Sequence, residues 1–196
     1  MQAARGASLS SSDEQGVPAT ARALPRRRIA LFFVVALVAF LVDQVTKYIA
    51  VERLTDRPNV RVVGDLFQLT LARNPGAAFS TGTGFTEVFA VIAIVATAVV
   101  IWFGLRARSA LWAFGLGMLL AGVMGNLADR VFRAPGLLSG HVVDFMALPH
   151  WPVFNVADVC INIAAIVIVI QAMRGARIDG TRSGAEAGGA ADGERS

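Results

Sequence analysis

The chain has 196 residues, of which 55% are hydrophobic and 16% are charged, and its mean hydropathy is +0.59. This composition is too apolar for a soluble domain of this length and favours a membrane protein. The net charge of +4 does not indicate nucleic-acid binding, because the arginines lie outside the apolar runs and form no stripe with aromatic residues. The single cysteine, Cys160, excludes a disulfide framework and a metal–thiolate cluster.

Two polar ends flank a central apolar region. Residues 1–25 are rich in Ala, Ser, Gly and Arg without periodicity, and residues 175–196 are polar and Gly-rich, so both predict disordered tails. Between them, residues 26–174 form the expected membrane domain. Four apolar runs in this domain approach the roughly 20 residues that a helix needs to cross a bilayer. They cover about 29–51, 85–105, 110–127 and 153–173.

Arginine clusters predict the orientation of these helices. The clusters are Arg26–Arg28 before the first run, Arg106 and Arg108 between the second and third, and Arg174 and Arg177 after the fourth. With four crossings they all fall on one side, so the positive-inside rule predicts that both termini are cytoplasmic. Segments 52–84 and 129–152 then lie outside. Alternating apolar residues in "VRVVGDLFQLTLARN" predict short strands of a small sheet there.

Polar side chains gather at the predicted outer ends of the helices. They are Asp43 and Lys47, Asn74 and Gly76, Asn126, Asp129 and Arg130, Asp144, and finally Asn155, Asp158 and Asn162. Helical spacing puts Asp43 and Lys47 at i,i+4, and places the last three polar residues on one face. Ionisable groups bordering a membrane usually face a polar interior or a site. Asp158, one turn inside an apolar helix, needs a partner or a proton, so we interpret it as functional.

Structural explanations remain open for the other polar residues. The Asp43–Lys47 pair could only stabilise the membrane boundary, Arg130 could extend to the interface, and Asn74 is a turn former. The small residues of the third helix, Gly117, Ala121 and Gly125, predict close helix packing.

The residue types limit the possible chemistry. Two histidines and scattered carboxylates form no metal-ligand motif. Ser80 with Lys47 is a weak nucleophile–base pair because Lys47 has an acidic partner, and Cys160 with His141 is weak because Cys160 points about 200° away from the nearby carboxylate. A carboxylate pair remains. Two such groups share one proton, so that one activates water and the other polarises a carbonyl, which is aspartic-type peptide hydrolysis.

Five motifs, "DQVTK", "NPGAAF", "GNLADR", "HVVDF" and "FNVAD", occur in this order across the four apolar helices. Over about residues 31–172 the chain resembles the bacterial lipoprotein signal peptidase family, also called signal peptidase II. The resemblance implies an all-α membrane protein, a four-helix bundle with a small extracytoplasmic β-sheet and a loop helix. It implies catalytic aspartates at Asp144 and Asp158, while Asp129 competes for one catalytic role. It implies supporting residues at Asp43, Lys47, Asn74, Gly76, Asn126, Arg130, Asn155 and Ala157.

The resemblance also implies a function. We expect a monomeric, cofactor-free aspartic endopeptidase of the cytoplasmic membrane that acts near the extracytoplasmic face. Its substrate would be a diacylglyceryl-modified prolipoprotein, cut N-terminal to the lipidated cysteine. An alternative is a small proton-coupled transporter or membrane-embedded binding protein that uses Asp158, although transporter carboxylates usually lie near the midplane. A purely structural four-helix scaffold is the third possibility.

Overall fold

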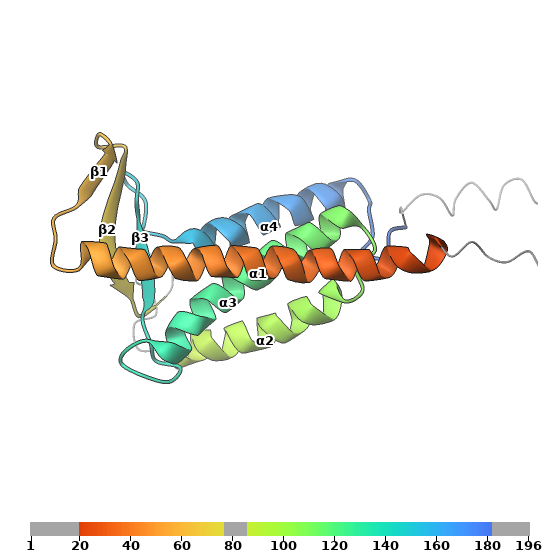
Figure 1. Ribbon diagram of the computed structural model, residues 1–196, viewed down its shortest axis with the longest axis horizontal. Helices are drawn as coiled ribbons and strands as arrows, with labels where there is room; N and C mark the ends of the chain where they lie inside the picture. Colours follow the sequence, from red (N-terminus) through yellow and green to blue (C-terminus); the bar gives the residue numbers. More distant parts are fainter. Residues whose placement is uncertain (1–19, 77–85, 182–196) are drawn as a thin grey trace, which may run out of the picture.

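The computed structural model describes residues 20–76 and 86–181. Four long helices form a bundle with a small sheet at one end (Figure 1). The elements are α1 (Thr20–Leu54), β1 (Val60–Val63), β2 (Phe67–Asn74), α2 (Thr86–Gly104), α3 (Ala110–Phe132), β3 (Val142–Ala147) and α4 (Val156–Met173). All four helices are long and apolar enough to span a membrane, with mean hydropathies of 2.4, 2.3, 1.6 and 2.2. The predicted helices and the first two strands are confirmed.

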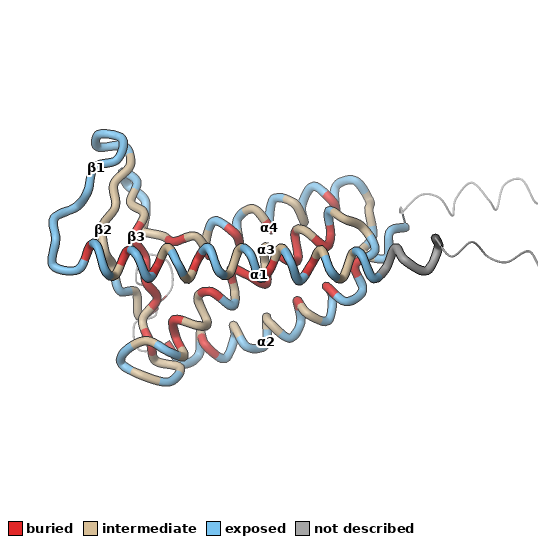
Figure 2. The backbone as a smooth tube through the Cα atoms, viewed as in Figure 1, coloured by how far each residue is buried: buried red, intermediate tan, exposed pale blue. Residues whose placement is uncertain are grey.

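The helix α3 is the centre of the bundle. Within the apolar spans, 44% of α3 is buried, against 17%, 17% and 22% of α1, α2 and α4. Glycines allow this close packing: a Cβ at Gly117 would lie 2.8 Å from Phe32 O on α1, and one at Gly122 would lie 2.5 Å from Ala157 O on α4. The predicted packing role of Gly117 is therefore confirmed. The outer faces of α1, α2 and α4 are largely exposed (Figure 2). Their exposed residues include large apolar ones such as Val34, Val95 and Val169, as suits helices surrounded by lipid.

The sheet has the order β1-β2-β3 with antiparallel pairing, and it covers the end of α1. The sequence did not predict β3. Val143 and Phe145 of this strand pack with Ala50 and Leu54 of α1 in one buried cluster. The β2–β3 register pairs Asn74 with Val142. The sheet thus fixes the ends of β2 and β3 above the bundle.

The structure describes only the inner parts of the two predicted tails, residues 20–25 and 175–181. The helix α1 already begins at Thr20, because Ala and Arg favour helix. Residues 175–181, predicted as tail, fold against α3: Trp112 Nε1 donates to Ala176 O at 3.1 Å, and the Arg108 N–H donates to Ile178 O at 2.9 Å. Burial of Ile178 against the bundle core explains this order. Within the described ranges, segments 133–141 and 148–155 contain turns and bends, and no loop helix is found there.

Candidate active site

A cavity of about 540 Å³ opens where the sheet meets the bundle. Its polar lining comes from two strands or their ends and from two helices. These residues are Asn74 at the end of β2 and Gly76 just after it, Asn126 and Arg130 on α3, Asp144 on β3, and Asp158 and Asn162 on α4. The remaining wall is apolar and is formed by the β3–α4 connection and by α4. The cavity therefore has a polar end that continues into an apolar groove.

Asp144 and Asp158 both line this cavity, although they belong to different elements. The chain between them is held in place by an isolated bridge, in which Met146 and Phe154 exchange hydrogen bonds of 2.9 Å. Because Phe154 directly precedes the cap residue of α4, this bridge brings the start of α4 beside Asp144.

Asn155 links the two carboxylates. Its Nδ2 donates to Asp144 Oδ1 at 2.6 Å, and its backbone N–H donates to Asp158 Oδ2 at 3.1 Å. Its Oδ1 accepts from the backbone N–H of Asp158 at 3.1 Å, which completes a capping box at the N-terminus of α4. The polar residues that begin this apolar helix therefore cap it and join it to β3.

The second oxygen of each carboxylate accepts from another amide. Asn126 Nδ2 donates to Asp158 Oδ1 at 2.9 Å, and Asn74 Nδ2 donates to Asp144 Oδ2 at 3.1 Å. Asp144 is only 3% exposed. Burial, together with the nearby charge of Asp158, raises the pKa of Asp144 from 3.8 to about 6. The two carboxylates are thus electrostatically coupled, and Asp144 retains a proton over a wider pH range than a surface aspartate.

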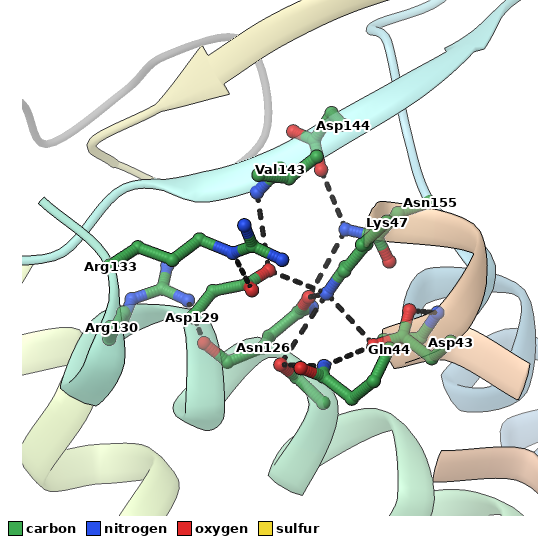
Figure 3. A network of polar contacts seen from close by, with 12 residues as sticks. Asp43, Gln44, Lys47, Asn126, Asp129, Arg130, Arg133, Val143, Asp144 and Asn155 are labelled. Atoms are coloured by element: carbon green, nitrogen blue, oxygen red, sulfur yellow. Dashed lines mark hydrogen bonds and ion pairs between the residues drawn. The ribbon is translucent and has the colours of Figure 1, made fainter. Parts of the chain in front are cut away.

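Lys47 forms the centre of a buried network behind the cavity (Figure 3). Its Nζ lies 3.0 Å from Asp43 Oδ2 and 2.8 Å from Asp129 Oδ2, and it donates to Asn126 Oδ1 at 3.0 Å. The two carboxylates offset a cation that is fully buried. Because Lys47 fixes Oδ1 of Asn126 as an acceptor, the Nδ2 of the same amide must point toward Asp158. Lys47 thereby acts on Asp158 through Asn126.

Asp43 connects α1 to α4. Its Oδ1 accepts from the backbone N–H of Ala157 at 2.8 Å, in the first turn of α4. Gln44 adds a second tie, since its Nε2 donates to Asp43 Oδ2 at 2.9 Å and to Gly125 O at 3.2 Å. A Cβ at Gly125 would lie only 2.5 Å from Asp43 Oδ2, so a glycine at this position leaves room for the Asp43 carboxylate. The start of α4 is therefore held against α1 as well as α3.

Asp129, the competing catalytic candidate, lies outside the cavity lining. It is 1% exposed, and its carboxylate pairs with Lys47 and Arg133. It also accepts from the backbone N–H of Val143 at 3.2 Å. Both oxygens are thus occupied by protein donors that tie α3 to α1 and β3, an arrangement that favours a structural role.

Arg130 is buried rather than extended to the membrane interface, with 8% of its surface exposed. Its Nη2 donates to Gly76 O at 2.9 Å, in a turn where Asn74 Oδ1 accepts from the Gly76 N–H at 3.0 Å. Its Nε is buried and has no hydrogen-bond partner within the described residues. Arg130 thus ties the turn after β2 to α3.

The structure brings all the predicted site residues together in two layers. The cavity holds Asn74, Gly76, Asn126, Arg130, Asp144 and Asp158. The layer behind it holds Asp43, Lys47, Asp129, Asn155 and Ala157. The prediction missed Gln44 and Arg133, although Gln44 follows Asp43 directly and Arg133 is four residues after Asp129, the spacing of neighbours on one helix face.

Two other hypotheses from the sequence concern a Ser80 nucleophile and a metal site. Ser80, considered as a nucleophile, lies outside the described residues. Among the residues that the structure does describe, no group of three or more His, Cys, Asp or Glu side chains is placed to hold a metal ion. The fold and the cavity define a multi-pass membrane protein with a paired-carboxylate site at one end of its bundle.

Comparison with known proteins gives the family. Residues 35–174 match the family described as Signal peptidase (SPase) II. The lipoprotein signal peptidase of Mycobacterium leprae (strain Br4923) is 47% identical, over 80% of this chain and 78% of that protein. The lipoprotein signal peptidase of Rhodococcus jostii (strain RHA1) is 44% identical, over 89% of this chain and 88% of that protein. The chain belongs to the signal peptidase II family, and it is therefore a membrane protease.

A solved structure agrees with this assignment. A bacterial membrane enzyme determined by the in meso method at 1.9 Å resolution has a TM-score of 0.64 to this chain and is 29% identical. The match covers 73% of this chain and 92% of that one. The four-helix bundle with its small sheet is thus shared with an experimentally determined membrane enzyme.

Proposed function

We propose that this protease removes the signal peptide from prolipoproteins whose cysteine carries a diacylglyceryl group, cutting on the N-terminal side of that cysteine. The names of the relatives, which are lipoprotein signal peptidases, support the substrate class. One observation carries the aspartic mechanism: Asp144 and Asp158 line the same cavity and are linked through Asn155.

The environments of the two carboxylates support different roles. Asp144, with its pKa raised to about 6 by burial and by the charge of Asp158, holds the shared proton. Asp158 lies in the first turn of α4, where the helix dipole favours a negative charge. Asp158 takes a proton from water as the water oxygen attacks the scissile carbonyl, and Asp144 donates its proton to the carbonyl oxygen. The C–N bond of the tetrahedral intermediate then breaks as Asp158 passes its proton to the leaving amine and Asp144 takes a proton back from a hydroxyl of the intermediate. No covalent intermediate is formed.

The surrounding residues bind the substrate or hold the aspartates. Arg130 and Asn74 line the cavity and bind substrate carbonyls. Asn155 and Asn126 orient the carboxylates, and the buried Lys47 supports Asn126. The apolar wall of the cavity accommodates acyl chains, so that lipid burial supplies binding energy away from the bond that breaks.

The site faces the extracytoplasmic side in this proposal. The start of α1, the α2–α3 turn and the end of α4 lie at the end of the bundle away from the sheet, and their sequences carry the arginine clusters (Figure 1). Arginine-rich segments next to membrane helices preferentially lie on the cytoplasmic side of the membrane. Polar groups that gather at one end of the bundle argue against the transporter alternative, which requires a midplane site.

Processing of a lipid-modified precursor by the full-length protein in proteoliposomes tests the proposal. Asp144→Asn and Asp158→Asn should each reduce cleavage by about 10³-fold or more while the protein still inserts. Asp65→Asn, at an exposed position on the sheet, is the matched control and should cleave normally. Near-wild-type cleavage by either variant would remove that aspartate from the pair, and complete loss in Asp129→Asn with normal folding would reopen the competing assignment.

A further inference from the structure

Asn162 is a polar residue of the cavity that the proposed mechanism does not use. It lies on α4 four residues after Asp158, its side chain is exposed, and it lines the cavity. Its neighbours on this wall, including Ile161, Ile163 and Ile166, are apolar. The span has a mean hydropathy of 2.2. An amide in such a place is unfavourable unless it forms hydrogen bonds.

The protein itself satisfies only part of this amide. Asn162 Nδ2 donates to the backbone oxygen of Asp158 at 2.9 Å, and this is the one hydrogen bond that its side chain makes among the described residues. A primary amide has two N–H donors and an oxygen with two lone pairs. One donor and the Oδ1 acceptor therefore remain for a molecule in the cavity.

We propose that Asn162 binds the main chain of the signal peptide a short distance N-terminal to the scissile bond. This inference rests on the proposed function. The four-residue separation puts Asn162 about 6 Å further along α4 than Asp158, away from the sheet. This distance corresponds to about two residues of an extended chain. A signal peptide that enters from the bilayer with its scissile bond at Asp158 therefore passes Asn162 about two residues earlier.

The chemistry of an unwound peptide explains why an amide is needed there. The signal peptide must leave its helix before it reaches the carboxylates, and the last turn of any helix has carbonyls without intrahelical partners. In an apolar cavity these groups cannot be satisfied by water, and each unsatisfied group is costly. Asn162 supplies a donor and an acceptor together, which matches the C=O and N–H of one extended residue.

Asn162→Leu tests the role on the enzyme side, because leucine is of similar size and suits an apolar helix. We expect KM for a lipid-modified precursor to rise about tenfold with kcat nearly unchanged, since binding is lost equally before and during the reaction. Ile170→Leu, an exposed position of the same helix outside the cavity lining, is the matched control and should leave both constants unchanged. Wild-type kinetics in Asn162→Leu would overturn the inference and leave the proposed function intact.

Ester replacement in the substrate provides a second test that does not depend on the variant's folding. Precursors in which single amide bonds before the cleavage site are replaced by esters lose one N–H and weaken one carbonyl. Wild-type enzyme should be most sensitive at the bond about two residues before the cut, and Asn162→Leu should lose this sensitivity. Equal sensitivity at every bond, or the same pattern in the variant, would overturn the inference. Absence of any cleavage by the wild type would overturn the proposed function and this inference together.

Discussion

The Nδ2 of Asn155 lies 2.6 Å from Asp144 Oδ1, so the residue that caps α4 also holds the carboxylate of β3. One side chain therefore contributes to the position of both the helix and the catalytic candidate. A change at Asn155 acts on both, and variants that separate the two effects are informative.

Asn155→Asp keeps a good N-cap residue but replaces the donor to Asp144 with an acceptor. We expect α4 to remain folded and cleavage to fall by about 100-fold or more, because a third carboxylate meets Asp144. The pH above which residual activity is lost should be higher than in the wild type. Asn155→Ser, which preserves only the cap, is the control for stability. Cleavage by Asn155→Asp within a few-fold of the wild type would contradict the proposed contact.

The pH dependence of cleavage follows from the pKa of Asp144, which is raised to about 6. A pair that must share one proton loses activity when both members ionise. We therefore expect kcat/KM to fall about tenfold per pH unit above roughly pH 6. Initial rates measured at low substrate concentration in buffers of constant ionic strength provide the test. A flat profile up to about pH 8 would contradict the assignment of the proton to this pair.

The same pKa predicts how stability changes with pH. As the pH rises from 3.8 to about 6, the unfolded chain releases the Asp144 proton before the folded protein does. The folded state then binds more protons, so its stability decreases through this window by up to about 3 kcal/mol and is constant above it. Asp144→Asn remains neutral and should avoid this loss. Thermal unfolding in detergent at both ends of this pH window should show that the stability of Asp144→Asn increases relative to that of the wild type as the pH rises. An equal change of stability in both proteins would contradict the prediction.

Gly122 on α3 determines how closely α4 can approach. A Cβ there would lie 2.5 Å from Ala157 O, which is backbone and cannot rotate away. Gly122→Ala should displace the start of α4, destabilise the protein by about 1–3 kcal/mol and reduce cleavage. The control is Leu111→Ala at an exposed position of the same helix, where the substitution introduces no new contact. The control should be close to wild type in melting temperature and activity, and equal effects of both variants would contradict this account.

The sequence predicted the helices well and the third strand not at all. Apolar length alone is sufficient to find a membrane span, and the alternation around Leu69 and Leu71 revealed β2. The first four residues of β3, Val142–Phe145, are all buried, since the strand contacts the bundle on one face and the site on the other. A strand covered on both faces has no period of two, so pattern analysis treated it as a loop.

For the candidate site, the sequence predicted the identity of the residues better than it predicted the contacts between them. Helical spacing paired Asp43 with Lys47 correctly. The contacts of Lys47 with Asp129, and of Asn155 with Asp144, depend on how α1, α3 and β3 meet, and no local spacing encodes this. The C-terminal segment was missed for a related reason, because its contacts with the bundle, the packing of Ile178 and the hydrogen bond from Trp112 to Ala176, are also tertiary.

The order of the elements along the chain has a consequence for biosynthesis. α3 is the helix on which the other three pack, while Asp144 and Asp158 both follow it in the chain. A nascent chain with three inserted helices already has Lys47 and Asp129 but lacks the second aspartate. Only when the last helix enters the bilayer does Asn155 reach β3. The paired carboxylates therefore exist only once the fourth helix is in place, and a chain that still lacks this helix has no complete site.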